Sequence, residues 1–424
     1  MTEINKQIEI NIPSTVNWIL SMLNASGYEA YIVGGCVRDA LMHVPPHDWD
    51  ICTSALPEEI MEVFKSYKII PTGLKHGTVT VMLNSEPFEI TTYRIDGEYE
   101  DNRRPKDVIF TKSLKQDLSR RDFTINAMAY NPQIGIVDIF NGMKDIELRI
   151  IRCVGNAEER FSEDALRILR AMRFAATLDF YIDLPTACAM DKCKDLLCNI
   201  SGERISSELT KMLKAEKRSL AFTLTYCTKC FLPIIPEMEE VIDEHWIPII
   251  YESKNFLNTR IALFFDMPED KLKDVMTRLK FCNAIIYSVI NTRQYGQELL
   301  NDIESCEDLQ YFAKSMMNKI GHTDTLNAVY YALAHIEHNR DYNAREKLFT
   351  FFEFANKAFN QHECYQLSTL GVNGNDIASA GFKGKKIGII LDYLLHMVMR
   401  GILRNNREEL LQRLESLDGM QEMS

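Results

Sequence analysis

The spacing of apolar residues changes near residue 150, and this change constrains the fold most strongly. Before it, segments such as Gly77–Leu83 (GTVTVML) and Pro87–Ile95 (PFEITTYRI) alternate and are rich in β-branched side chains, which is typical of strands. After it, Leu, Ile, Met and Phe recur at three- and four-residue spacing nearly to the C-terminus, which is typical of helices. The sequence therefore predicts an α+β head with a mixed or antiparallel sheet, followed by an elongated all-α remainder.

Composition and charge argue against two classes of protein. The 424 residues include 48 Lys and Arg against 60 Asp and Glu, a net charge of −12. This balance argues against indiscriminate nucleic-acid binding but leaves room for a local basic groove. No apolar run approaches the ~18 residues that a membrane-spanning helix needs, and the N-terminus lacks the pattern of a secretory signal. We therefore expect a cytoplasmic protein without membrane contact.

The segment Val33–Thr53 (VGGCVRDALMHVPPHDWDICT) begins with a glycine turn. Its glycines match neither the dinucleotide motif GxGxxG nor the phosphate loop that ends in GK[ST]. A double glycine, Gly34 and Gly35, before a predicted helix still offers close approach and backbone N–H groups to a phosphate, and Arg38 adds a positive charge. Taken alone, a tight structural bend explains the turn better.

The same segment ends in a pair of carboxylates, Asp48 and Asp50. On a strand these two share a face, while Trp49 points into the core. Two like charges this close repel each other unless a cation lies between them. Carboxylate oxygens suit Mg²⁺, which takes substrate phosphates as further ligands. Glu89, on a neighbouring predicted strand, is the best-placed third carboxylate, although strand acids are often simply exposed.

Charged residues also open the segment Asp117–Tyr130 (DLSRRDFTINAMAY). Arg121 has the charge and the reach to contact a triphosphate. Asp122 and Asn126 are four residues apart in a helix-like run and could face a ribose. A helix cap with surface ion pairs explains the same pattern, so this segment alone does not decide between the two.

The segment Arg160–Phe180 (RFSEDALRILRAMRFAATLDF) is the most informative, and we expect it to be helical. On one helix the core-facing stripe consists of Ala165, Leu169, Met172 and Ala176. The opposite half carries Asp164, Arg167, Arg170 and Arg173. A solvated face normally mixes Glu, Lys and Gln, whereas three arginines at three-residue intervals behind an acid favour planar recognition and phosphate contact.

An Asp–Arg pair on this helix has the chemistry to select a base without a template. Cytosine and adenine both present an amino donor beside a ring-nitrogen acceptor, which Asp164 and Arg167 would complement. Uracil and guanine present a carbonyl beside an N–H at the same places. Each mispaired buried group would then cost roughly 1–3 kcal/mol.

Five motifs in this order give the chain a close resemblance to a known family. They are VGGCVRD with DWD, TTYRIDGEYEDNRRPKDVIF, DLSRRDFTINAMAYN, RFSEDALRILRAMRF and ISGERISSELTKML. In these motifs the chain resembles the class II, bacterial-type CCA-adding tRNA nucleotidyltransferases of the DNA polymerase beta superfamily. The match is close from residue 28 to about residue 215 and resumes more weakly in the tail segment that begins at Leu370.

The resemblance implies a reaction and a set of site residues. CMP and AMP would pass from CTP and ATP to the 3′-hydroxyl of tRNA without a template, with release of pyrophosphate and with Mg²⁺ as cofactor. Asp48 and Asp50 would bind Mg²⁺ and act in catalysis with Glu89. The nucleotide would be bound by Gly35, Arg38, Arg121, Asp122, Asn126, Glu163, Asp164, Arg167, Arg170 and Arg173.

The resemblance also implies four parts in the chain. These are a nucleotidyltransferase head at 1–150, a helical neck with the base-reading motif at 151–218, a helical body at 219–350 and a helical tail at 351–424. We expect the tail to contact tRNA, together with a basic lining of the head. The basic tail residues are Lys383, Lys385, Lys386, Arg400, Arg404 and Arg407. A merely solvated basic surface explains these residues about equally well.

Two residues depart from the family pattern, and several alternative activities share the same head. His43 stands where the family usually has Gly, and among larger residues His tolerates a left-handed backbone well. Trp49 replaces Phe or Ile. The alternatives are an A-adding or CC-adding enzyme, a poly(A) polymerase, or an RNA-binding protein with an inactive head. The intact loop at 96–110 counts against a CC-adding enzyme, and intact Asp48 and Asp50 count against an inactive head.

Overall fold

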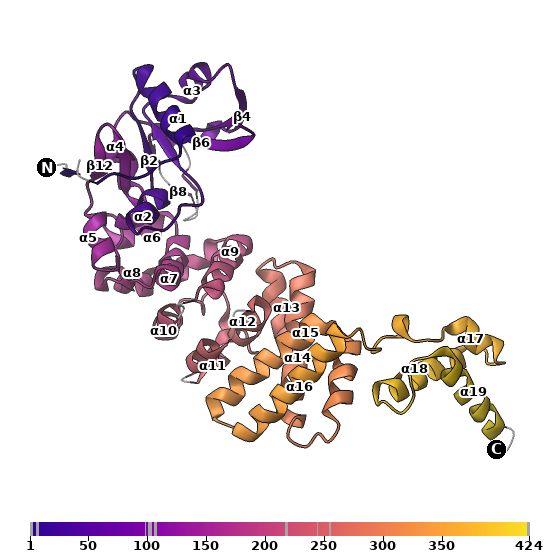
Figure 1. The fold of residues 1–424 in the computed structure, drawn as a ribbon. Coiled ribbons are helices and arrows are strands. Elements are labelled where there is room, and N and C mark those ends of the chain that lie inside the picture. The colour runs from indigo at the N-terminus through magenta and orange to yellow at the C-terminus, as the bar shows by residue number, and fades with distance from the viewer. Residues whose placement is uncertain are drawn as a thin grey trace. The chain divides into compact units, whose positions relative to one another are not determined.

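The computed structural model divides the chain into two compact units, Met1–Pro236 and Glu237–Ser424 (Figure 1). The described residues are 3–5, 8–97, 99–100, 104–105, 108–216, 219–243, 245–253 and 256–421. The first unit holds the predicted head and neck. The predicted boundary at 350/351 falls inside a helix of the second unit, Tyr342–Asn360. The division into four parts remains a prediction.

The head contains an eight-stranded sheet in the order β1-β12-β11-β2-β3-β6-β5-β4. Neighbouring strands are antiparallel except β3 and β6, which are parallel. The predicted mixed sheet is therefore confirmed. The strands are β1 (Glu3–Asn5), β2 (Ala30–Val33), β3 (Ile51–Thr53), β4 (Lys68–Gly73), β5 (Thr78–Leu83), β6 (Glu86–Thr92), β11 (Met128–Asn131) and β12 (Gly135–Asp138).

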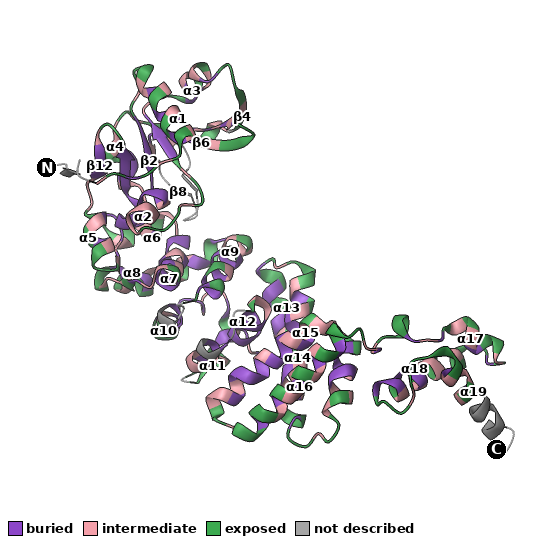
Figure 2. Ribbon diagram, viewed as in Figure 1, coloured by how far each residue is buried: buried purple, intermediate pink, exposed green. Residues whose placement is uncertain are grey.

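Both faces of the central strand β2 are covered, so all four of its residues are buried. Ala30 and Ile32 belong to a core with the helices α1 (Ser14–Ala25), α2 (Gly35–Leu41) and α3 (Pro57–Val63). Tyr31 and Val33 belong to a second core on the other face, with Leu118 of α4 (Leu114–Ser119). This alternation follows from the two-residue period of a strand, and it holds β2 and the following turn in place. Figure 2 shows the buried strands in purple.

The predicted loop at 96–110 is partly a β-structure. Strand β7 (Arg94–Asp96) pairs antiparallel with β10 (Val108–Phe110), and β8 (Tyr99–Glu100) pairs with β9 (Arg104–Pro105). The other residues of this segment, apart from Gly97, lie outside the described residues.

The rest of the first unit is helical, apart from the short parallel pair β13 (Ile150–Ile151) and β14 (Tyr181–Ile182). The predicted core stripe is confirmed, because Ala165, Leu169, Met172 and Ala176 are all buried. The helices are α5 (Gly142–Glu147), α6 (Ala157–Glu163), α7 (Leu166–Leu178), α8 (Leu184–Cys193), α9 (Gly202–Lys214) and α10 (Ser219–Thr228).

The single helix predicted over Arg160–Phe180 is wrong, because α6 and α7 are separate helices. Asp164 lies between them with an extended backbone, φ −141° and ψ 100°. Its side-chain Oδ1 accepts a hydrogen bond from the backbone N–H of Leu166 at 3.2 Å. Such local bonds compete with the backbone bonds of a continuous helix. Asp164 therefore stands at a helix junction rather than on the regular face of one helix.

The second unit is built from helices in the described residues, as the spacing of apolar residues predicted. One core joins α14, α15 and α16, and a separate core joins α17, α18 and α19. The helices are α11 (Trp246–Glu252), α12 (Leu257–Phe264), α13 (Glu269–Arg278), α14 (Asn283–Asp302), α15 (Leu309–Asn339), α16 (Tyr342–Asn360), α17 (Gly374–Ser379), α18 (Lys385–Met399) and α19 (Arg407–Gln421). None of the helices described is both long and apolar enough to cross a bilayer.

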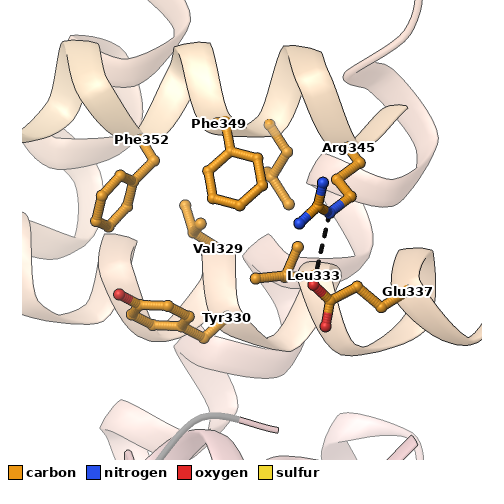
Figure 3. A pocket seen from close by; sticks show the side chains of 8 residues that line it. Val329, Tyr330, Leu333, Glu337, Arg345, Phe349 and Phe352 are labelled. Atoms are coloured by element: carbon orange, nitrogen blue, oxygen red, sulfur yellow. Dashed lines mark ion pairs between the residues drawn. The ribbon is translucent and has the colours of Figure 1, made fainter. Parts of the chain in front are cut away.

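The packing of α15 against α16 leaves a pocket of about 210 Å³ (Figure 3). Rings of Tyr330, Phe349 and Phe352 line it, and an ion pair between Arg345 and Glu337 (3.6 Å) lies beside them. The guanidinium of Arg345 lies 4.9 Å from the ring centroid of Phe349. The wall is therefore mostly aromatic and aliphatic, with one charged edge.

Candidate active site

The glycine turn after β2 depends on Gly34 rather than on Gly35. Gly34 has φ 85° and ψ −133°, a backbone conformation that side-chain-bearing residues rarely adopt. A Cβ there would also lie 3.0 Å from Nη1 of Arg121. Gly35 is the first residue of α2, so it places the helix start and Arg38 beside this turn. The predicted site residues included Gly35 but not Gly34, whose backbone the turn requires.

The carboxylates of Asp48 and Asp50 come just before β3 rather than within it. The carbonyl of Asp50 accepts the N–H of Val33 at 3.0 Å, which ties the acid pair to the glycine turn. Trp49 packs against the head core, as predicted. The two acids share a pocket of about 490 Å³ with Glu89. Ile51 of β3 aligns with Ile90 of β6, and this parallel register explains why Glu89 lies beside the pair.

The acid pair has the chemistry of a cation site. Desolvation by the surrounding protein raises the pKa of the Asp50 carboxyl, although the side chain keeps solvent contact. The positive charge of Arg121 opposes this rise, and the negative charge of Asp48 adds to it. A bound cation would relieve the repulsion between the two carboxylates, and their hard oxygen atoms fit Mg²⁺. Among the described residues, no three His, Cys, Asp or Glu side chains are gathered as a ready metal cluster. Two carboxylates are thus in place, and substrate oxygens would have to complete a coordination shell.

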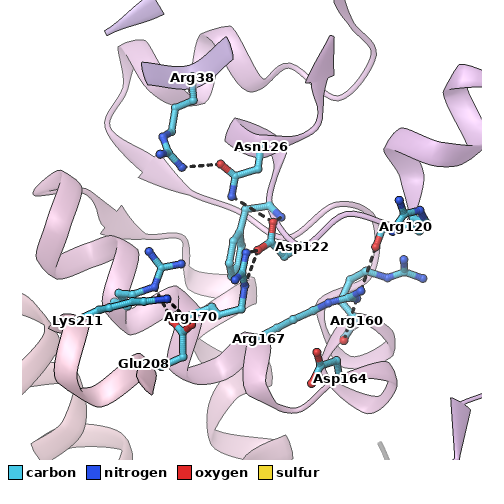
Figure 4. Close-up of polar contacts among 12 residues, drawn as sticks. Arg38, Arg120, Asp122, Asn126, Arg160, Asp164, Arg167, Arg170, Glu208 and Lys211 are labelled. Atoms are coloured by element: carbon cyan, nitrogen blue, oxygen red, sulfur yellow. Dashed lines mark hydrogen bonds and ion pairs between the residues drawn. The ribbon is translucent and has the colours of Figure 1, made fainter. Parts of the chain in front are cut away.

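A chain of polar contacts joins α2 to α7 across the site (Figure 4). Arg38 donates to Oδ1 of Asn126 at 2.6 Å, and Nδ2 of Asn126 donates to Oδ1 of Asp122 at 3.2 Å. Oδ2 of Asp122 accepts two hydrogen bonds from Arg170, at 2.8 and 2.5 Å. Asn126 lies on the short 3₁₀ helix η2 (Thr124–Asn126). The structure thus brings together four of the predicted site residues.

Asp122 is held ionised by this chain. Burial alone would raise its pKa, but the guanidinium of Arg170 and the amide of Asn126 hold it down at about 2. Arg170 in turn has a raised pKa, chiefly because of Asp122. The pair is therefore charged throughout the physiological range.

Asp164 and Arg167, the predicted base readers, lie at the junction of α6 and α7. Oδ2 of Asp164 accepts from Nη2 of Arg204 at 2.7 Å. Arg167 is buried and donates to Oε2 of Glu163 at 2.7 Å and to the carbonyl of Arg120 at 3.0 Å. A carboxylate accepts about four hydrogen bonds, so Asp164 retains acceptor capacity beside its bonds to Arg204 and Leu166.

Arg121 and Arg173 are each fixed by a buried acid that the sequence reasoning missed. Asp117 is 1% exposed and pairs with Arg121 (3.4 Å) and Arg120 (2.9 Å). Burial raises the pKa of Asp117, but the two arginines lower it below its usual value. Its spacing of three and four residues from them was a signal that could have found it.

The acid that holds Arg173 is Glu208 of α9, at 2.5 Å. Burial lowers the pKa of Arg173, and this acid opposes the shift. Glu208 and Arg204 both come from α9, some forty residues further along the chain. The segment ISGERISSE was recognised as a motif, but its spacing carried no information about these partners.

The comparisons with known proteins agree with this geometry. Residues 30–152 match the sequence profile of the "Poly A polymerase head domain", and residues 179–242 match that of the "Probable RNA and SrmB- binding site of polymerase A". The CCA-adding enzyme of Enterococcus faecalis is 34% identical over 403 residues, which cover 93% of this chain and 93% of that protein. The CCA-adding enzyme of Pediococcus pentosaceus is 35% identical, with 94% and 96% covered.

Solved structures give the same result. The Bacillus stearothermophilus CCA-adding enzyme in complex with CTP has a TM-score of 0.78 and 28% identity, and the match covers 96% of this chain and 98% of that one. The Thermotoga maritima CCA-adding enzyme complexed with tRNA has the same fold, with a TM-score of 0.71 at 23% identity and 96% of each chain covered. The chain therefore belongs to the family of CCA-adding enzymes.

Proposed function

We propose that this chain completes the 3′ end of tRNA by adding C, C and A from CTP and ATP, with Mg²⁺ as its metal. The observation that carries this conclusion is one pocket lined by Asp48, Asp50 and Glu89, next to the glycine turn, in a chain related over 93% of its length to a CCA-adding enzyme. An A-adding or CC-adding enzyme and a poly(A) polymerase are not favoured, because the relatives that match nearly the whole chain are named CCA-adding enzymes.

The reaction forms one bond and breaks another at the α-phosphorus of the nucleotide. The 3′-hydroxyl of tRNA gives up its proton to water as its oxygen attacks this phosphorus, the bond to the β-phosphate breaks, and pyrophosphate leaves. Mg²⁺, when bound, supplies positive charge for the attacking and leaving oxygens. We assign its binding to Asp48 and Asp50, and we assign Glu89 as the third carboxylate beside them.

The nucleotide would lie between α2 and α7. Arg38 and Arg121 stand beside the glycine turn and supply positive charge for the triphosphate. Asp122 and Asn126 present polar atoms for the ribose, and Arg170 and Arg173 extend the positive surface along α7. Asp164 and Arg167, with Glu163 beside them, would read the base at the junction of α6 and α7. The contacts of these side chains with one another support this assignment, because they hold each group in one orientation.

Incorporation of single labelled nucleotides tests the proposal. The chain is incubated with Mg²⁺, one labelled nucleoside triphosphate at a time, and tRNA that ends before CCA, after C or after CC. We expect C on the first two substrates and A on the third. Incorporation of A on the third substrate without any incorporation of C on the first two would identify an A-adding enzyme. Long A tails on unrelated RNA would identify a poly(A) polymerase. No incorporation on any substrate would contradict the proposal.

Three variants test the assigned carboxylates. Asp48→Ala should abolish incorporation, and Glu89→Gln should lower its rate, because the neutral amide removes the third negative charge assigned beside the pair. Asp179→Ala is the matched control, because Asp179 is an acid of the same unit that lies outside the assigned site and pairs with Arg149 at 3.7 Å. It should keep the rate of the parent chain. Full activity of Asp48→Ala would contradict the assignment.

A further inference from the structure

The ring of Phe174 lies at the centre of three guanidinium groups. Phe174 is on α7 and is 5% exposed. The central guanidinium carbons of Arg38, Arg170 and Arg173 lie 5.1, 5.5 and 3.9 Å from the centroid of its ring. Arg38 comes from α2, whereas the other two come from α7. One side chain is therefore shared by the helix of the glycine turn and the helix of the arginine series.

Hydrogen bonds fix the edges of these guanidinium groups. Arg38 donates to Asp39 and Asn126, Arg170 donates to Asp122, and Arg173 donates to Glu208. The acceptors lie on α2, on η2, on α9 and in the segment just before η2. What the three guanidiniums have in common is the aromatic ring that they surround, and a cation near the face of a ring is attracted by its negative charge density.

The ring itself is held by a second aromatic residue. Phe123 packs edge-on against Phe174, with the centroids 5.8 Å apart and the planes at 84°. Phe123 is fully buried and directly follows Asp122 in the chain, just before η2. The edge of one ring is positive and the face of the other is negative, so this arrangement is attractive and directional.

We propose that Phe174 is a positioning residue for the incoming nucleotide: its ring holds Arg38, Arg170 and Arg173 in the orientation that binds CTP and ATP. A leucine would fill much of the same volume but would offer no negative face to the three cations. The guanidiniums would then lose part of the attraction that gathers these like charges around one point. This inference rests on the proposed function, because it concerns the same nucleotide site.

The proposal predicts a graded effect on nucleotide affinity and none on the choice of base. Phe174 is replaced by phenylalanines with one, two and three ring fluorines, which withdraw charge from the ring face with little change of shape. The dissociation constants of CTP and ATP, measured with Mg²⁺ and without tRNA, should rise stepwise and by similar factors. We expect about fivefold over the whole series, which corresponds to one moderate cation–π contact. Discrimination against UTP and GTP should stay unchanged.

Phe64 provides the matched control. It is fully buried in the head core, where it packs against Trp18 at 6.0 Å between the ring centroids. The same fluorinated series at Phe64 should leave both dissociation constants unchanged. The variants Phe174→Leu and Phe64→Leu extend the test without unnatural residues, because both lose packing. Only Phe174→Leu should raise the dissociation constants of CTP and ATP. The rate of Phe174→Leu at saturating nucleotide should change by a smaller factor than its dissociation constants.

Two results would overturn the inference, and both differ from a failure of the proposed function. The first is a flat series at Phe174, and the second is an equal trend at Phe64. If instead the unmodified chain bound neither CTP nor ATP, or failed to extend tRNA, the proposed function itself would be contradicted.

Discussion

Arg167 illustrates at the scale of one residue how far sequence reasoning reaches. Its place in the arginine series predicted a planar donor for the nucleotide, and this role remains a proposal. The sequence did not predict that its guanidinium would be buried and bonded to Glu163 and to the backbone of Arg120. The first partner lies one helical turn away, but the carbonyl is 47 residues distant in the chain, and only the folded structure brings it near.

Removal of Arg167 should relax the choice of base. We expect Arg167→Ala to incorporate UTP and GTP roughly 5- to 150-fold more readily relative to CTP and ATP, because each buried group mispaired with the wrong base costs roughly 1–3 kcal/mol. Single-nucleotide incorporation with all four triphosphates measures this ratio. Arg149→Ala, at an exposed site in the same unit, should retain the original preference. An unchanged preference in Arg167→Ala would refute the role of this residue in reading the base.

Single residues of the head show which features of the site the sequence could predict and which required the structure. Strand periodicity predicted Asp48, Asp50 and Glu89 as a group, but Asp48 and Asp50 precede β3. The parallel register of β3 and β6 brings Glu89 beside them, and the roles of the three acids remain a proposal. The structure places all three in one pocket. Gly35 was named for nucleotide binding, and that role remains a proposal; the backbone angles add that Gly34 is the position in this turn with the conformation that favours glycine. His43 was predicted to tolerate a left-handed backbone, and its φ of 58° confirms this.

At the scale of the element, periodicity predicted helices and strands well but their interruptions poorly. The apolar stripe of Ala165, Leu169, Met172 and Ala176 is buried as predicted. The same spacing of apolar residues continues back to the buried Phe161 of α6, so the spacing did not indicate the break at Asp164. The break depends on a side-chain bond to the backbone of Leu166, which competes with the helix but leaves the spacing of apolar residues intact.

The buried contact between Asp122, just before η2, and Arg170 of α7 should make the stability of the first unit depend on pH. The pKa of Asp122 is about 2 when folded, below its ordinary value of 3.8. Because the pKa is lower in the folded chain, Asp122 contributes its full stabilisation when the pH is above its pKa in the unfolded chain. This contribution is lost as the pH falls from about 4 towards 2. At neutral pH it is worth on the order of 2 kcal/mol.

Urea unfolding at several pH values tests this contact. The difference in unfolding free energy between the parent chain and Asp122→Asn should be constant above about pH 5 and should shrink as the pH is lowered towards 3. Asp191→Asn is the control, because the Asp191 side chain, which pairs with Lys194, is 60% exposed. The unfolding free energy of this variant should differ little from that of the parent chain at any pH. A difference for Asp122→Asn that does not change with pH would count against the linkage.

At the scale of the whole molecule, the net charge of −12 must be reconciled with a polyanionic substrate. Four acids of the first unit around the nucleotide site are paired with arginines, so these four do not oppose binding as free charges would. They are Asp117, Asp122, Glu163 and Glu208. In the second unit, Lys383, Lys385 and Lys386 are exposed around the start of α18. Arg407 is paired with Asp376 at 2.7 Å, and Arg400 lies 4.5 Å from the ring of Tyr311. The three lysines and Arg404, which is also exposed, are therefore the best candidates for contacts with tRNA phosphates.

Binding of tRNA should weaken steeply with salt, because each phosphate contact releases counterions. Between about 50 and 200 mM salt, the logarithm of the binding constant should fall linearly with the logarithm of the salt concentration. Lys385→Ala combined with Lys386→Ala should reduce that slope by about two, one for each lost phosphate contact. Lys271→Ala serves as the control, because Lys271 belongs to the same unit but is paired with Glu240 at 2.6 Å. If the double variant and the control had the same slope as the parent chain, these two tail lysines would be only a solvated surface, and the tRNA groove would have to lie elsewhere.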